Sequence, residues 1–224
     1  MNNPQTADVN YDPLTGIPLT NGIRVYVLCK RIFDIAGSGA ALILLSPLLL
    51  LVALAIKLED GGNIFYISSR VGVGGRRFKF IKFRSMVMNA DQLKERIESM
   101  NQHDDHRTFK LKQDPRTTLT GRIIRRLSID ELPQLWNVLF GDMSIVGPRP
   151  TIPNEVDQYA TSDLYRFDVL PGLTCIWQVS GRGDIPFEQQ VQMDLDYIQQ
   201  RSMWFDLKLV FKTIPAVLSG KGAY

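Results

Sequence analysis

The sequence predicts a mostly helical α+β fold, in which one domain is anchored to a membrane by a helix–break–helix hairpin and contains one small β-hairpin. Two observations carry this prediction. No charged residue occurs from Ile35 to Ile56, a stretch long enough for a membrane helix. Further on, two runs rich in Phe and Ile flank a glycine-rich turn, which is typical of a β-hairpin. We expect residues 1–22 to form a flexible tail and residues 23–224 a single domain.

Composition excludes several classes of protein. The 224 residues carry a net charge of only +3, which argues against a nucleic-acid binder that depends on global charge. Hydrophobic residues make up 45% of the chain, too many for a disordered protein. Two cysteines exclude a disulfide framework. A mean hydropathy of -0.05 excludes a polytopic membrane protein.

The apolar segment is interrupted near its midpoint by Pro47. Proline has no N–H, and its ring clashes with the carbonyl of Ile43, so we expect a kink. Ser46 can donate a hydrogen bond to a carbonyl that the proline leaves free. Two interpretations stay open for this membrane helix, residues 32–57. It either crosses the bilayer as a kinked helix or forms a re-entrant hairpin that leaves by the face it entered.

Basic residues flank the apolar segment on both sides and favour the re-entrant interpretation. Such residues prefer the cytoplasmic side of a membrane, so neither flank is an obvious candidate for translocation. Those before the segment are Lys30 and Arg31, and those after it are Lys57, Arg70, Arg76, Arg77, Lys79, Lys82 and Arg84.

The pattern predicts strands over Ile64–Arg70 and Phe78–Met88, joined by a turn at residues 71–75. No acidic residue occurs between Gly61 and Ala90. The alternation of Phe with Lys or Arg fits an ordinary amphipathic strand, or a surface that binds phosphate or anionic headgroups. On the second interpretation, Lys82 and Arg84 are substrate-binding candidates.

Two further helices are expected. Residues 89–100 read as an exposed helix, followed at His103–His106 by a solvated loop whose spacing matches no known zinc site. Residues 193–218 read as one amphipathic helix, which belongs either to the core or to the membrane interface.

The segment Ser128–Leu139 reads as a helix with a capping box between Ser128 and Glu131. A start one or two residues later would instead place Pro133 in the first turn, where its missing N–H is harmless. On both readings Asp130 and Glu131 lie in the first helical turn. The positive end of the helix dipole would then bind phosphate and keep Asp130 ionised.

Several arginines stand near turns fixed by proline and glycine. Arg125 precedes the acidic pair, Arg149 lies in a Gly-Pro-Arg-Pro run, and Arg182 follows Ser180-Gly181. Guanidinium groups pair well with diphosphate oxygens, so these residues around two carboxylates predict an anionic substrate.

From about Lys30 to its C-terminus, the chain resembles the bacterial sugar transferases, the monotopic polyprenyl-phosphate phosphoglycosyl transferases. The motifs that carry the resemblance are Lys30–Asp34, Ser46-Pro47, Lys82–Met86, Asp114–Arg116, Leu127–Leu135, Gly141–Pro150 and Pro171–Thr174.

The resemblance implies transfer of a sugar 1-phosphate from a UDP-sugar to undecaprenyl phosphate, with release of UMP. It assigns Asp130 as the nucleophile that forms an aspartyl-phosphosugar intermediate, and it implies a need for Mg²⁺, with Asp130 and Glu131 as ligands. Ser46 and Pro47 would break the re-entrant helix. Arg149 would lie near the nucleotide sugar, and Arg125 would support the catalytic helix.

The resemblance also places the active site at the membrane surface, on the cytoplasmic face of the bacterial inner membrane, among interfacial amphipathic helices and anionic lipids. The reaction would be the first membrane step of exopolysaccharide, capsule or O-antigen synthesis. The ending Gly222–Tyr224 looks like that of members that transfer galactose or glucose. Larger relatives carry further domains, so this chain looks like the catalytic core alone.

Alternatives stay open. Asp130 could serve only as a metal ligand in a direct displacement, and Glu131 as a ligand, a base or a helix cap. A non-catalytic scaffold for polysaccharide assembly is the competing class. Nucleic acid is not expected as a partner, and a homodimer is left open.

Overall fold

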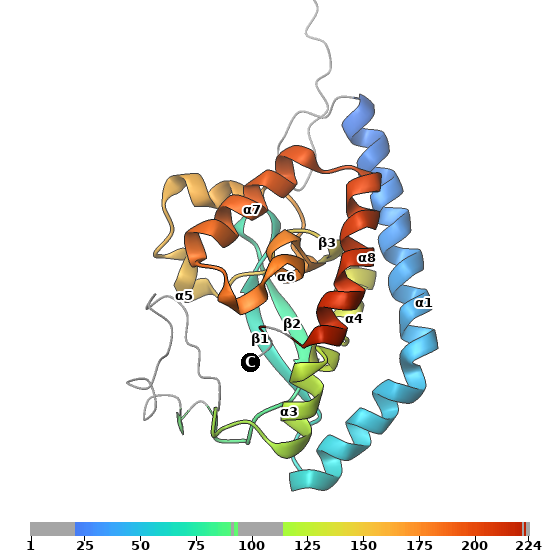
Figure 1. The fold of residues 1–224 in the computed structure, drawn as a ribbon, viewed down its shortest axis with the longest axis vertical. Coiled ribbons are helices and arrows are strands. Elements are labelled where there is room, and N and C mark those ends of the chain that lie inside the picture. The colour runs from blue at the N-terminus through green and yellow to red at the C-terminus, as the bar shows by residue number, and fades with distance from the viewer. Residues whose placement is uncertain (1–20, 91, 94–113, 221, 223–224) are drawn as a thin grey trace, which may run out of the picture.

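The structure, a computed structural model, describes residues 21–90, 92–93, 114–220 and 222. Almost all of the predicted tail, most of the helix expected at 89–100 and the loop at 103–106 lie outside the described residues. The described chain forms a helical head with a small β-hairpin at its centre, and one long helix runs along its side (Figure 1).

The long helix α1 spans Asn21–Asp60 and contains the whole predicted membrane segment. It is continuous by its hydrogen bonding, but it bends in its second half (Figure 1). Ser46 Oγ donates to the carbonyl of Ile43 at 2.8 Å, the carbonyl that Pro47 leaves without its helical N–H. The predicted break is therefore a repaired bend within one helix.

α1 is long and apolar enough to cross a membrane, as judged by length and composition. Only 17% of its most apolar stretch is buried against the head, which is little for the core helix of a soluble protein. Its middle part exposes large aliphatic side chains, among them Ile43, Leu44, Leu50 and Leu51.

Polar contacts fasten the N-terminal half of α1 to the head. Lys30 Nζ lies 2.8 Å from Asp206, and the Arg31 guanidinium donates to the carbonyls of Val138 and Leu139 at 2.7 and 2.8 Å. The Asp34 carboxylate accepts hydrogen bonds from Ser144 Oγ at 3.0 Å and from the N–H of Ile145 at 2.9 Å.

The C-terminal end of α1 is fastened to the same head. Val52 and Ile56 form a buried cluster with Phe83 and with Ile124 of α3, which spans Leu119–Arg126. Glu59 accepts a hydrogen bond from the N–H of Leu119, at the start of α3, at 2.8 Å.

The predicted β-hairpin is confirmed. β1 (Phe65–Val71) and β2 (Arg77–Phe83) pair antiparallel, with Phe65 opposite Phe83. The turn holds Gly74 and Gly75 at positive φ, which glycine adopts without strain. β2 ends earlier than predicted, because the chain turns after Phe83 to form a bridge between Met86 and Thr117.

Behind the hairpin, α4 (Gln134–Phe140) packs against β2 through a cluster of Phe80, Val138 and Met143. β3 (Ser144–Val146) and β4 (Gly172–Thr174) then form a short parallel pair. The elements that follow β3 in the remaining chain are α5 (Pro153–Val156), η4 (Thr161–Asp168), α6 (Ile176–Ser180), η5 (Arg182–Asp184), α7 (Phe187–Gln200) and α8 (Met203–Ser219).

The single C-terminal helix predicted for residues 193–218 is wrong. Two helices, α7 and α8, meet at a turn through Arg201 and Ser202. Ser202 Oγ accepts a hydrogen bond from the N–H of Phe205 at 3.2 Å and so caps a new helix start. α8 lies beside α1, while α7 and α5 cover the side of the hairpin away from α1 (Figure 1).

Candidate active site

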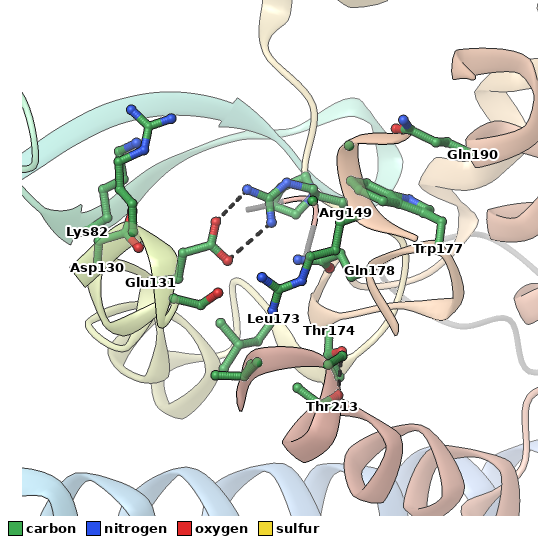
Figure 2. Close-up of a pocket in the computed structure, with 18 of the residues that line it drawn as sticks. Lys82, Asp130, Glu131, Arg149, Leu173, Thr174, Trp177, Gln178, Gln190 and Thr213 are labelled. Carbon is green, nitrogen blue, oxygen red and sulfur yellow. Dashed lines mark hydrogen bonds and ion pairs between the residues drawn. The ribbon is translucent and has the colours of Figure 1, made fainter. Parts of the chain in front are cut away.

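A cavity of about 840 Å³ opens between the hairpin, the Asp130 turn, α6 and α8. It brings together six of the seven residues predicted for catalysis or substrate binding, from five different elements or loops (Figure 2). These are Lys82, Arg125, Asp130, Glu131, Arg149 and Arg182.

The acidic pair lies in a tight turn and not in an α-helix, so the predicted helix over Ser128–Leu139 is partly wrong. Ser128 is left-handed (φ 53°), and the 3-10 helix η3 spans Ile129–Glu131 before α4 begins at Gln134. Pro133 precedes α4 at a position that needs no N–H donor. The predicted capping box is wrong, because no side chain caps η3.

The side chain of Asp130 is buried within the cavity. Its side chain is only 7% exposed, yet among the described residues no hydrogen bond or ion pair holds its carboxylate. Burial, together with the neighbouring charge of Glu131, raises the pKa of Asp130 to about 6. Asp130 therefore lies in a short 3-10 turn and not at the start of the α-helix that was predicted to favour its ionised form.

Glu131 has the opposite environment. Arg149 holds it with a two-pronged contact, Nη2 to Oε1 at 2.5 Å and Nη1 to Oε2 at 3.2 Å (Figure 2). Burial alone would raise the pKa of Glu131, but the charge and hydrogen bonds of Arg149 bring it below its ordinary value. Two adjacent carboxylates thus differ in partner and in the direction of their pKa shift.

Three cations of the cavity are free to meet an anion. Among the described residues, no hydrogen bond or ion pair engages the side chains of Lys82, Arg125 or Arg182. Burial lowers the pKa of Lys82, an effect that the charge of Asp130 opposes. Arg182 is held at a left-handed φ of 54° on η5, a strained conformation typical of functional sites.

Arg84 lies outside the cavity. Its guanidinium pairs with Asp60 at the end of α1, and its side chain is 9% exposed. Ser46 and Pro47 do not line the cavity either, although their neighbour Leu45 does.

The structure adds cavity residues that the sequence reasoning did not name as site residues. Arg70 extends from β1, and Trp177 of α6 lies with its ring centroid 5.9 Å from the Arg149 guanidinium carbon. Arg166 lines the cavity and is paired with the buried Asp194. Long-range packing assembles these residues, so no local spacing could have indicated them.

The donor set fits a magnesium ion that is shared with substrate. Mg²⁺ is usually held by one or two carboxylates and by substrate phosphates. Asp130 offers one unpartnered carboxylate, whereas both oxygens of Glu131 contact Arg149. No group of three His, Cys, Asp or Glu side chains with metal-site geometry occurs among the described residues, so substrate oxygens would complete the coordination that these residues offer.

Comparison with known proteins places most of the chain within one family. A family model described as bacterial sugar transferase matches residues 25–220. The exopolysaccharide production protein ExoY of Rhizobium meliloti is 43% identical over 200 residues, which cover 88% of either chain.

Two further relatives carry names that state a reaction. The undecaprenyl-phosphate galactose phosphotransferase of Salmonella typhimurium is 44% identical over 87% of this chain and 41% of its own length. The UDP-glucose:undecaprenyl-phosphate glucose-1-phosphate transferase of Caulobacter vibrioides is 41% identical over 88% of this chain and 72% of its own length.

Proposed function

The chain belongs to the bacterial sugar transferase family, and we propose that it transfers a hexose 1-phosphate from a UDP-sugar to undecaprenyl phosphate and releases UMP. The observation that carries this proposal is the Asp130 carboxylate, which is buried in a cavity of cations and has no hydrogen-bond or ion-pair partner among the described residues. Galactose and glucose are the sugars that the names of the two relatives state. The product would begin an exopolysaccharide, capsule or O-antigen repeat.

Asp130 acts as the nucleophile of a two-step transfer. One carboxylate oxygen attacks the phosphorus that bears the sugar, and the bond from this phosphorus to the bridging oxygen of the diphosphate breaks. UMP leaves with the bridging oxygen, and the sugar phosphate stays on Asp130 as an acyl phosphate. A phosphate oxygen of the lipid then attacks the same phosphorus and frees the carboxylate. Two anionic substrates therefore need never be bound together.

The surrounding cations stabilise the charge of the transferred group. Lys82 and Arg125 contribute charge close to Asp130, and Arg182 approaches from η5. Arg149 is oriented by Glu131 and by Trp177, which leaves a rigid guanidinium at the cavity wall. Glu131 is thus a positioning residue for Arg149.

Mg²⁺ is part of the proposal. Held by Asp130 and by diphosphate oxygens, it would offset phosphate charge and polarise the phosphoryl group. Removal of divalent cations should stop turnover.

The contacts of α1 support re-entrant insertion. Lys30 and Arg31 at one end of the apolar stretch contact the same head as Val52 and Ile56 at the other. A helix that crossed the bilayer would carry its two ends to opposite sides. Because the exposed leucines lie in the middle of α1, this middle part is the deepest point, and both ends stay on the cytoplasmic face.

Exposed aromatic side chains support an interfacial position of the head. Trp136 and Phe140 of α4 stack with ring centroids 5.8 Å apart and are 43% and 74% exposed. Trp204, at the start of α8, is 78% exposed. Aromatic rings of this kind prefer the headgroup region of a membrane.

The test is a trapping experiment on the purified full chain in nanodiscs. UDP-galactose or UDP-glucose labelled in the β-phosphate, supplied with Mg²⁺ but without lipid acceptor, should leave label on the protein and release UMP. Undecaprenyl phosphate should then discharge the label. Release of UMP only when the lipid is present, without labelled protein, would support direct displacement. No UMP from any UDP-sugar would contradict the proposal.

A further inference from the structure

The cavity is charged at one end and apolar at the other. Its charged end surrounds Asp130, whereas α8 supplies a wall of aliphatic side chains. We infer that this apolar wall, formed by α8 and by Leu45 of α1, holds the first isoprene units of the lipid acceptor and leads them from the membrane to Asp130. The inference rests on the proposed function and assigns the acceptor's path within the same site.

The face of α8 that forms the wall begins at Val210, which packs against the core, and continues beyond the core toward the C-terminus of the helix. Val210, Ile214 and Val217 recur at the spacing of one helical face and line the cavity. Asp206 and Leu209 point instead into the buried core. Burial in the head therefore does not explain the aliphatic residues toward the C-terminus of α8, and Ile214 is 55% exposed.

Polar atoms within the wall are already satisfied. The hydroxyls of Thr174 and Thr213 lie 2.7 Å apart, and Thr213 Oγ1 also donates to the carbonyl of Leu209 at 2.8 Å (Figure 2). Because these hydroxyls have partners, a hydrocarbon chain could bind beside them without leaving a buried hydrogen-bond donor unsatisfied.

The wall is continuous with the apolar surface of α1. Leu45 lines the cavity, while its neighbours Ile43 and Leu44 face outward and are 75% and 78% exposed. At the other end of the wall, Leu132 lines the cavity only two residues from Asp130. A chain could thus pass from the surface of α1 to the carboxylate along aliphatic side chains.

An isoprenoid monophosphate is the occupant that matches both ends. A nucleotide sugar has no hydrocarbon chain, so an aliphatic wall would not stabilise its binding. An amphiphile with a phosphate head would place its anionic oxygens near Lys82 and Arg125 and would bury its first units against Ile214 and Val217.

Photolabelling of the full chain in nanodiscs tests the path without relying on catalysis. The probe is farnesyl phosphate with a benzophenone at the end of its chain. We expect crosslinks within residues 210–218 and near Leu45, with displacement by undecaprenyl phosphate. Ala216→Phe narrows the wall and should weaken labelling about tenfold, the loss of roughly two buried methylene groups. Phe211→Ala is the control on the same helix, because Phe211 is 68% exposed and does not line the cavity.

Two results would overturn the path. Crosslinks confined to other elements would exclude the wall, and equal displacement by phosphatidylglycerol would make it a site for bilayer lipid. Kinetics separate this inference from the proposed function. Ala216→Phe should raise the KM for undecaprenyl phosphate, and it should change the rate at which labelled UMP exchanges into UDP-sugar much less. The fold-change in KM should exceed the fold-change in exchange rate about tenfold. If the parent chain shows no such exchange, the proposed function fails, and the crosslink positions still decide the path.

Discussion

Buried carboxylates in two regions of the molecule have opposite surroundings. Where α1 docks on the head, Asp206 accepts hydrogen bonds from Tyr26 at 3.0 Å, Lys30 at 2.8 Å and Tyr197 at 2.8 Å. Asp34 in the same region accepts two. In the cavity, Asp130 is also buried, at 7% exposed, and accepts none from the described residues.

The difference separates a structural role from a chemical one. A buried charge is costly unless hydrogen bonds compensate it, and the docking region supplies that compensation. Among the described residues, none donates such a hydrogen bond to Asp130, so a substrate or a cation can compensate its charge instead. Burial alone therefore does not identify a functional carboxylate, whereas burial without a partner does.

The comparison predicts its largest effect for Asp130→Asn. This change removes the proposed nucleophile and no contact made by the described residues, so turnover should fall by at least about a thousandfold while the fold stays intact. The measurement is UMP release together with circular dichroism. Glu131→Gln is the companion variant. It should lose less activity, because Glu131 acts on the reaction only indirectly, by orienting Arg149. Substantial activity in the Asn variant would contradict covalent catalysis.

In the docking region the effect should appear in stability. Asp206→Ala removes the acceptor of the Lys30 ammonium and of the Tyr26 hydroxyl, and leaves Tyr197 only the carbonyl of Val146, which should lower the free energy of unfolding by about 3–5 kcal/mol. Thermal unfolding in nanodiscs measures the change. The exposed Asp157 provides the control, and Asp157→Ala should shift the unfolding temperature very little. Equal shifts in the two variants would mean that the docking contacts add no stability.

The pH dependence of stability should test the raised pKa of Asp130. Its pKa of about 6 in the fold exceeds the ordinary 3.8, so between these values the folded state binds more protons than the unfolded state. Stability from this group is thus present at low pH and lost as pH rises through 6. In EDTA, the Asn variant should gain about 1–3 kcal/mol relative to wild type between pH 4 and pH 7. A difference that does not change with pH would contradict the raised pKa.

The smallest effect is expected for Arg84→Gln. Because Arg84 pairs with Asp60 outside the cavity, the KM for the UDP-sugar should change by no more than about twofold per folded molecule. Arg149→Gln, within the cavity, should raise the same KM by more than about tenfold. A comparable loss in both variants would place Arg84 in substrate binding.

Sequence patterns predicted the elements whose signals are local. The two strands, their glycine turn, the long apolar helix and the hydrogen bond from Ser46 to Ile43 all follow from spacing and residue type, and the structure confirms them. The cavity residues near Asp130 were also predicted, because they stand in recognisable motifs.

Predictions from local residue spacing were wrong where the backbone departs from regular geometry. Nothing in the periodicity of Ser128–Leu139 indicates a left-handed Ser128, which ends α3 and turns the acidic pair into η3. The break at Ser202 was hidden because apolar residues continue in register through it. Arg70 and Trp177 reach the cavity only through packing between distant segments, which one sequence does not reveal.

The attachment of α1 at both ends has a mechanical consequence. A free transmembrane helix adjusts to bilayer thickness by tilting, but α1 cannot tilt without carrying the head along. If α1 inserts as proposed, thinner or thicker lipid should therefore raise or lower the Asp130 carboxylate relative to the headgroups. The proposed transfer would then depend on acyl-chain length even when the acceptor concentration is constant.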